Sequence, residues 1–166
     1  MKFHLVDRVE LIEPGKKIVT IKALSLAEEY LADHFPAFPV LPGVLMLEAM
    51  VQAAAWLVRV RQNFAKSIVV LSAARNIRYA NFVAPGNIMR CELDAVEITE
   101  TSAKFKGVAS VEGKTTVSGK IELKCFNLSE RAAFLAEADE KIVALLKDRW
   151  KLIHGPEALA AAGAPA

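Results

Sequence analysis

Cysteine is scarce in this chain of 166 residues, which holds only Cys91 and Cys125. The two lie far apart, and the sequence has no Cys-x-x-Cys pair or Cys/His cluster, so it indicates neither a disulfide framework nor a metal site. We expect both cysteines to be small buried side chains in strands, which fits a reducing compartment.

The chain also lacks an excess of charge of either sign. Its 21 basic and 19 acidic residues leave a net charge of +2, which argues against a nucleic-acid-binding protein. Residues 1–8 carry charges where a secretory signal needs an apolar run. The longest apolar stretch, 44–58, contains Glu48 and Gln52 and is shorter than the roughly 20 residues of a membrane span. We therefore expect a cytoplasmic protein that neither crosses a membrane nor binds nucleic acid.

Apolar residues, in contrast, are abundant. They make up 54% of the chain, and the mean hydropathy is +0.30, which is high for one domain of ordinary size. Such a chain has apolar surface to cover, either in a partner subunit or along a tunnel for an apolar ligand.

Strand patterns surround one long helical pattern. Ser25 and Glu28 form a capping-box pattern before a short helix over 26–31. The helix predicted over 43–64 is apolar nearly all round in its first half, so we expect it to be buried on all sides. Strands are predicted at 3–12, 17–23, 67–83, 88–99, 102–111 and 115–126, with a hairpin turn at 112–114.

Short connections between the last four strands imply an antiparallel sheet. We therefore predict an α+β fold in which one long buried helix packs on that sheet. An amphipathic surface helix is predicted over 129–153, with Phe134 and Trp150 on its apolar face. The alanine-rich end, 156–166, is expected to fray.

The segment 34–52 combines an imidazole, a helix N-terminus and a carboxyl group. His34 precedes a proline-stiffened loop that leads into the helix at Gly43, whose N–H has no acceptor within the helix and can stabilise an oxyanion. Glu48 follows in apolar surroundings, where a carboxyl is protonated, paired or hydrogen-bonded and can act as a general acid. Gln52, one turn further on, is placed to orient it.

The residues around these groups are apolar, namely Phe35, Leu45, Leu47 and Met50. Together the segment fits a reaction that removes a proton α to a carbonyl and protonates a β-leaving group. Structural roles are the alternative, since a histidine before Phe-Pro is usually structural and Glu48 could be an interface charge.

The stretch HFPAFPVLPGVLMLEAMVQ (34–52) resembles the active-site segment of the β-hydroxyacyl-acyl-carrier-protein dehydratases of fatty-acid synthesis, roughly GHFPGxPVxPGVLxxEAMAQ, with the same spacing of 14 from histidine to glutamate. The resemblance extends from LVDRVELIEPGKKIV through NIRYANFVAPGN (76–87) to about residue 126. It implies the hot-dog fold, a long central helix wrapped by an antiparallel sheet. Residues 1–126 would then form the dehydratase domain and 127–166 an extra helical extension.

The resemblance also implies a role for each matching residue. His34 would remove the α-proton, Glu48 would protonate or orient the departing hydroxyl, and the Gly43 N–H would polarise the thioester carbonyl. Residues implied to line the tunnel or orient these groups are Phe35, Pro42, Val44, Leu47, Gln52 and Tyr79. We expect no cofactor and no metal ion.

The implied partners are an acyl carrier protein and a second copy of the chain. The substrate would be a (3R)-hydroxyacyl group on the carrier's phosphopantetheine thioester, converted to the trans-2-enoyl product. The family forms homodimers, often joined as trimers of dimers, and each site takes its histidine from one subunit and its glutamate from the other. Arg75 and Arg78 are candidates to contact the acidic carrier, although such arginines are most often simply solvated.

Three positions depart from the family pattern, and other functions stay open. Asp33 and Ala37 stand where the family has glycine, and Phe38 replaces a polar residue. These changes leave room for a hot-dog protein that binds acyl chains without catalysis. A dehydratase that also isomerises the double bond is a further alternative, although that branch usually carries Asp where this chain has Glu48. A thioesterase is another, although thioesterases of this fold generally lack the motif.

Overall fold

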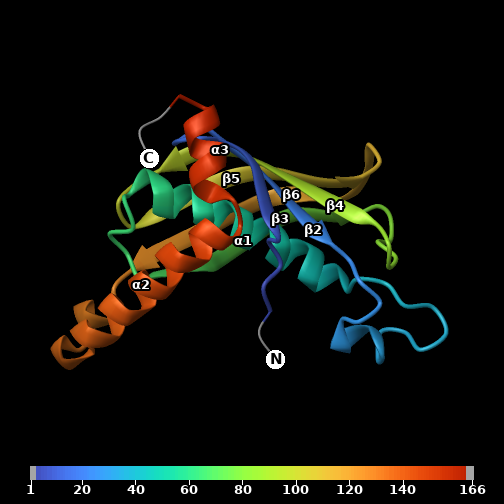
Figure 1. The fold of residues 1–166 in the computed structure, drawn as a ribbon, viewed down its shortest axis with the longest axis horizontal. Helices are drawn as coiled ribbons and strands as arrows, with labels where there is room; N and C mark the ends of the chain where they lie inside the picture. Colours follow the sequence, from blue (N-terminus) through green and yellow to red (C-terminus); the bar gives the residue numbers. More distant parts are fainter. Residues whose placement is uncertain (1–2, 164–166) are drawn as a thin grey trace.

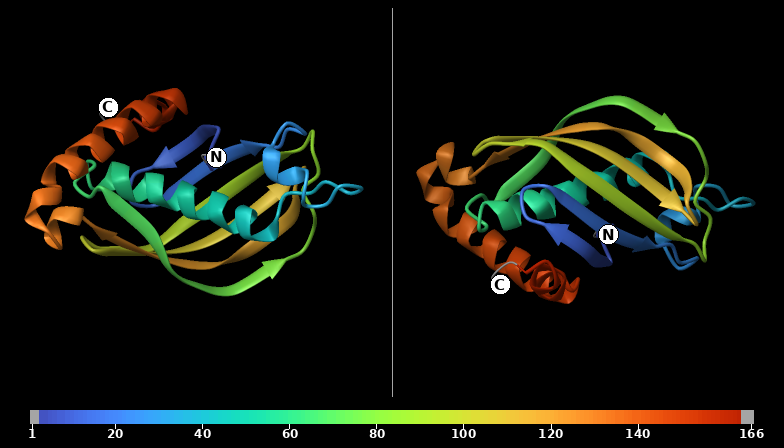
Figure 2. Two further views of the ribbon diagram at one scale, coloured as in Figure 1. Left: turned by 90° about the horizontal axis from the view of Figure 1, so that it is seen from below. Right: turned by 90° about the horizontal axis from the view of Figure 1, so that it is seen from above.

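A computed structural model describes residues 3–163 of the protein. Six strands form one sheet in the order β1-β2-β4-β5-β6-β3, and every neighbouring pair is antiparallel. The strands are β1 (Arg8–Glu13), β2 (Lys17–Ala23), β3 (Ile68–Tyr79), β4 (Ile88–Ile98), β5 (Ser102–Val111) and β6 (Lys114–Phe126). The sheet curves around the central helix (Figures 1 and 2), which confirms the predicted α+β, hot-dog arrangement.

The central helix, α1 (Gly43–Arg61), packs against strands β2 to β6 from within that curve. It ends three residues earlier than predicted, because Asn63 and Phe64 adopt positive φ angles of 49° and 58°. Residues 53–58 are all buried. The first turns are not, since Val44 is 69% exposed, and the expectation of burial on all sides is therefore wrong for this end of the helix.

By length and composition α1 could cross a membrane, and no other helix within residues 3–163 could. However, 56% of its most apolar stretch is buried inside the fold, where it forms the core under the sheet.

The tight turns form where the sequence predicts them. Glu112 and Gly113 both take left-handed φ angles, 49° and 78°, and connect β5 to β6 as a two-residue hairpin loop.

The short helix predicted over 26–31 is reduced to a 3-10 turn, η1 (Glu29–Leu31). Glu28 does not complete a capping box, because its carboxylate pairs with Lys22 Nζ at 2.7 Å.

The first strand starts later than predicted. β1 begins at Arg8, whereas residues 3–5 use their backbone groups to bind the side chain of Gln52. Residues 3–5 therefore bind the central helix and are not part of the sheet.

The C-terminal extension forms helices α2 (Ala136–Leu152) and α3 (Gly155–Ala161) after two 3-10 turns, η2 (Leu128–Glu130) and η3 (Ala133–Leu135). The predicted helix over 129–153 thus starts seven residues late, because the Asp139 carboxylate accepts hydrogen bonds from the N–H groups of Leu128 and Ser129, both at 2.9 Å. Trp150 packs on Trp56 of α1 with ring centroids 5.5 Å apart. Phe134 is 84% exposed, so its placement on the packed face was wrong.

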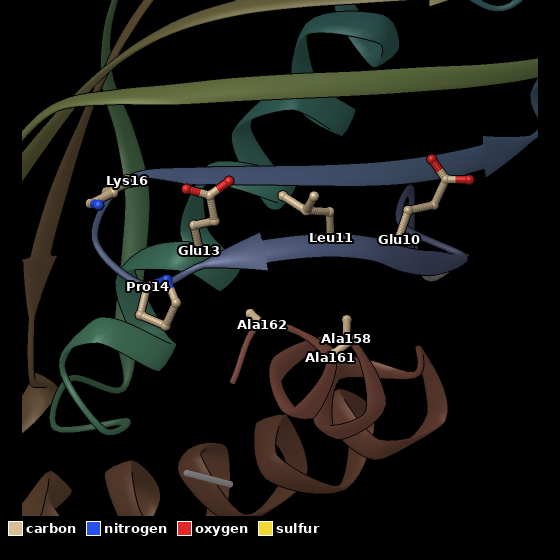
Figure 3. A pocket seen from close by; sticks show the side chains of 8 residues that line it. All are labelled: Glu10, Leu11, Glu13, Pro14, Lys16, Ala158, Ala161 and Ala162. Atoms are coloured by element: carbon tan, nitrogen blue, oxygen red, sulfur yellow. The ribbon is translucent and has the colours of Figure 1, made fainter. Parts of the chain in front are cut away.

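The C-terminal end was predicted to fray, but residues 155–161 form helix α3, so the prediction is wrong for them. Residues 164–166 lie outside the described part. Ala158 and Leu159 are buried, and α3 packs against β1. The chain just before α3 also reaches the strand, where Val9 N–H donates to Ile153 O at 2.8 Å. A hollow of about 510 Å³ opens between β1 and α3 (Figure 3). The extension therefore lies against the β1 edge of the sheet, while β3, at the other edge, pairs with β6 on one side and with no strand of residues 3–163 on its outer side.

Both cysteines are buried and unpaired, as predicted. Cys91 lies in β4 and Cys125 in β6, and burial raises the pKa of the Cys91 thiol to about 12. In the part of the chain that the structure describes, no group of three His, Cys, Asp or Glu side chains is placed to hold a metal ion.

Candidate active site

The His34 loop is held closed by its own hydrogen bonds. Phe35 and Phe38 exchange two backbone bonds of 3.2 and 3.0 Å, and Val40 N–H donates to His34 O at 3.1 Å. The ring of Phe35 stacks on the imidazole, with centroids 4.2 Å apart. The three prolines of this segment limit its other conformations, so the half-buried His34 side chain has a fixed position.

One contact fixes the tautomer of the neutral imidazole. His34 Nδ1 lies 3.0 Å from Val40 O, and a carbonyl oxygen can only accept a hydrogen bond. Nδ1 therefore carries the hydrogen in the neutral ring, and Nε2 keeps its lone pair. This is the form in which a histidine can take a proton.

The start of α1 lies at the end of this loop. Leu41 N–H donates to Val83 O at 2.8 Å, and the carbonyl of Pro42 accepts from Leu45 and Met46 at 2.9 and 3.1 Å. Gly43, the first residue of α1, therefore presents its N–H at the helix N-terminus, where the partial positive charge of the helix is concentrated.

Tyr79, at the end of β3, packs directly against this helix start. A β-carbon on Gly43 would lie only 3.0 Å from Tyr79 Cε1. The absence of a side chain at residue 43 thus lets the half-exposed ring of Tyr79 approach the backbone.

Glu48 lies about a turn and a half after Gly43 on α1 and is half-buried. Its Oε1 accepts a 2.9 Å hydrogen bond from Gln52 Nε2, as the spacing of four residues predicts. Leu47 packs partly buried against the core, whereas Val44 is largely exposed. The carboxyl is therefore oriented by one amide on an incompletely covered face of the helix.

His34 and Glu48 do not meet within one chain. In residues 3–163 no hydrogen bond or ion pair joins them, and each is held by its own neighbours. Four surface hollows of about 290 to 510 Å³ open on the molecule, and neither side chain lines any of these four. A single chain thus presents the two groups separately.

One aromatic contact near the site was missed by sequence reasoning. Phe82, just after β3, packs edge-on against Phe38 with centroids 5.5 Å apart. An apolar residue at position 38, where the family has a polar one, indicates an apolar contact but does not indicate its partner. The exposed apolar residues near the loop and the start of α1 are Phe35, Phe38, Val44, Tyr79 and Phe82. Exposed apolar surface of this kind marks an interaction site.

Three arginines lie on the two elements that form the site, Arg59 on α1 and Arg75 and Arg78 on β3. Arg59 stacks over Trp56 at 5.3 Å, and burial lowers its pKa to about 10. Arg75 is exposed and pairs with Glu122 at 3.0 Å, and Arg78 is exposed. Arg59 therefore belongs to the core near α2, and the other two lie on the surface.

Comparison with known proteins identifies the family. Residues 1–121 match the FabA-like domain. The 3-hydroxyacyl-[acyl-carrier-protein] dehydratase FabZ of Ruminiclostridium cellulolyticum is 38% identical over 122 residues, which cover 72% of this chain and 84% of the relative. FabZ of Halalkalibacterium halodurans is 40% identical over 114 residues, or 68% and 81% of the two chains. The chain belongs to the FabA-like family.

Solved structures show how widely this FabA-like architecture is shared. The dehydratase heterocomplex ApeI:P of Xenorhabdus doucetiae matches with a TM-score of 0.65 at 19% identity, over 80% of this chain and 90% of that one. A mutant of the thioesterase PA1618 of Pseudomonas aeruginosa matches with a TM-score of 0.56 at 10% identity, over 73% and 81%. Proteins with different names share the fold, so the reaction has to be argued from the site.

Proposed function

We propose that this FabA-like protein removes water from a 3-hydroxyacyl thioester carried by an acyl carrier protein and forms the trans-2-enoyl thioester. The observation that carries the proposal is the contact of His34 Nδ1 with Val40 O, because it makes Nε2 the nitrogen that can accept a proton when the ring is neutral. The names of the FabZ relatives support the same reaction.

In this reaction His34 Nε2 takes the proton from the α-carbon. The electron pair moves toward the thioester carbonyl, whose developing negative charge is stabilised by the Gly43 N–H. The same electrons then form the α,β double bond as the β-carbon–oxygen bond breaks, and Glu48 gives its proton to the hydroxyl, which leaves as water. His34 ends protonated and Glu48 ionised, and one proton returned through water restores both.

The Gln52 amide determines which carboxyl oxygen does this work. Because Nε2 donates to Glu48 Oε1, that oxygen is the acceptor, and the acid proton belongs on Oε2. Gln52 therefore directs the donor oxygen away from itself and toward the substrate.

The complete site requires a second copy of the chain. β3 is a 12-residue edge strand, and unpaired edges of this length pair readily with another strand. Antiparallel pairing of β3 with the β3 of a second copy gives a twofold-symmetric homodimer. His34 of one subunit then acts with Glu48 of the other, and the channel between them is lined by Phe35, Pro42, Val44, Leu47 and Tyr79.

The proposal extends to the carrier and to the setting of the enzyme. Arg75 and Arg78, both exposed, contact the acidic carrier protein. Residues 1–126 form the catalytic domain and 127–166 an extension outside it. The protein works in the cytoplasm, and dimers join further as trimers of dimers.

A spectroscopic assay tests the reaction. Enoyl absorbance is followed with a 3-hydroxyacyl thioester and with the crotonyl thioester for the reverse hydration. His34→Ala and Glu48→Gln are each expected to lower kcat by at least about 100-fold, while Phe134→Ala, on the exposed face of the extension, leaves it unchanged.

Each alternative function gives a different result in this assay. A wild type without turnover that still binds the thioester would indicate an acyl-binding protein. A β,γ-unsaturated product would indicate an isomerase, and release of free thiol a thioesterase. Activity that survives both substitutions would overturn the mechanism.

A further inference from the structure

The backbone of residues 3–5, here called the N-terminal clamp, binds both ends of the Gln52 side-chain amide. Leu5 N–H donates to Gln52 Oε1 at 2.9 Å, and Gln52 Nε2 donates to Phe3 O at 3.0 Å. The second hydrogen of the same amide goes to Glu48 Oε1 at 2.9 Å. Within residues 3–163 these three hydrogen bonds of the Gln52 amide are thus made with the clamp and with the proposed catalytic acid.

These contacts permit only one orientation of the amide. If the group were turned over, its oxygen would face the oxygens of Glu48 and Phe3, and its NH2 group would face the N–H of Leu5. All three hydrogen bonds would be replaced by contacts between groups of the same kind. The clamp therefore decides that Gln52 presents a donor to Glu48.

The clamp is itself anchored on both sides. The side chain of Leu5 is 2% exposed and belongs to the hydrophobic core. The ring of Phe3 stacks on Tyr30 of η1, with centroids 6.2 Å apart. Next to Tyr30, the Glu28 carboxylate binds the buried ammonium of Lys22 in β2. The position of the clamp is thus fixed by the core and by the sheet.

We infer that the N-terminal clamp is a positioning element for catalysis, which holds Gln52 so that Glu48 Oε2 faces the substrate. The clamp touches neither the substrate nor the reacting atoms, and it acts through Gln52 alone. This inference rests on the proposed function for its catalytic consequence. The geometry of the clamp itself can be tested without any turnover.

Two substitutions at Leu5 separate the N–H from the side chain. Leu5→Pro removes both the leucine side chain and the N–H, whereas Leu5→Ala removes only the side chain. In the full-length chain, Leu5→Pro is expected to lower kcat about tenfold below Leu5→Ala, with KM within about twofold, because misorientation of an acid affects the chemical step. Phe3→Ala, which releases the stacking on Tyr30 but leaves the core intact, is a second variant in case Leu5→Pro does not fold.

A double-mutant cycle shows whether the effect passes through Gln52. In a Gln52→Leu background, Leu5→Pro and Leu5→Ala should have the same kcat, and Phe3→Ala should cause no further loss. If the tenfold difference persists in that background, the clamp acts by another route and the inference is wrong.

Nuclear magnetic resonance provides a measurement that does not depend on activity. The chain has two glutamines, so labelling with [15N]glutamine gives one side-chain amide signal for Gln52 and one for Gln62. Gln62 Nε2 donates to Thr99 O and Glu100 O, far along α1 from the clamp, and serves as the internal control.

In Leu5→Pro and Phe3→Ala, the Gln52 amide protons should exchange with solvent at least about tenfold faster than in the wild type, with Gln62 unchanged. Unchanged exchange at Gln52 in both variants would overturn the inference, whether or not the wild type is a dehydratase. A wild type with slow exchange at Gln52 but no turnover would contradict the proposed function and leave the clamp standing.

Discussion

The ring of Tyr79 lies so close to Gly43 that a β-carbon there would be 3.0 Å from Tyr79 Cε1. Gly43→Ala should displace the ring or the helix start by a few tenths of an ångström. Because Tyr79 is half-exposed and can move, the free energy of unfolding should change by less than about 1 kcal/mol. Catalysis depends on the position of the Gly43 N–H, so kcat/KM should fall about tenfold.

Tyr79→Leu provides the control for this prediction, since it removes the ring atoms Cε1 and Cζ that crowd residue 43. In that background Gly43→Ala should cost much less activity than in the wild type. An equal loss in both backgrounds would mean that the contact is not the cause.

The β3 edge should determine the oligomeric state. Ala74 is an exposed residue in the middle of β3, and Ala74→Lys would bring two like charges close together when two such strands pair. Light scattering should show the wild type near twice 18.1 kDa or a multiple of it, and the variant near 18.1 kDa with its activity lost. Val96→Lys, at an exposed position of the interior strand β4, should keep both the mass and the activity of the wild type. A monomeric, fully active wild type would contradict a shared site.

Asp139 should make stability depend on pH. Burial alone would raise the pKa of its carboxyl, but hydrogen bonds from Ser67 and from the N–H groups of Ser129 and Leu128 bring it well below the usual range. A folded-state pKa below the unfolded value of about 3.9 means that the ionised group stabilises the fold above that pH and loses this effect as the pH falls further.

Denaturant unfolding of Asp139→Asn tests this linkage. The variant should be less stable than the wild type at pH 7, and the difference should shrink below about pH 4. Asp148→Asn, on the exposed face of α2, should show no such trend. A difference between Asp139→Asn and wild type that stays constant with pH would refute the assignment.

The start of α3 depends on Gly155, its first residue, which packs under a tryptophan. A β-carbon on Gly155 would lie 2.1 Å from the ring of Trp150, which itself packs on Trp56. Gly155→Ala should therefore lower the free energy of unfolding by about 1–3 kcal/mol. Ala160→Gly, at an exposed position of α3, should cost no more than about 1 kcal/mol. Equal stability of Gly155→Ala and the wild type would mean that α3 does not dock as described.

Much of the fold could be predicted because local patterns and tertiary packing agree. The alternating residues of 17–23 became β2 without any change of boundary, and the turn at 112–114 formed as its residues favour. The predictions of secondary structure fail where a residue distant in the sequence determines the local conformation. Residues 3–5 were predicted as strand but bind Gln52, and Asp139 delays the start of α2 by holding the chain at Leu128.

The site was predicted less completely than the fold. Its proposed residues come from the motif that joins His34 to Glu48, and their roles stay predictions, whereas the hydrogen bond between Glu48 and Gln52 followed from helical spacing. The partners of His34 and the contact of Phe38 with Phe82 could not be predicted, because they depend on how the loop closes on itself and on β3. Roles that need a second subunit stay predictions, since no single chain contains both groups in contact.

The position of α3 against β1 has a consequence for how large an assembly can grow. If two chains join through β3, the combined sheet ends in a β1 strand on each side, and a helix already rests against each of those ends. Strand-by-strand addition is then terminated after a single pairing event, so the sheet cannot propagate into a fibre. In this view α3, by covering the outer side of β1, keeps the assembly finite.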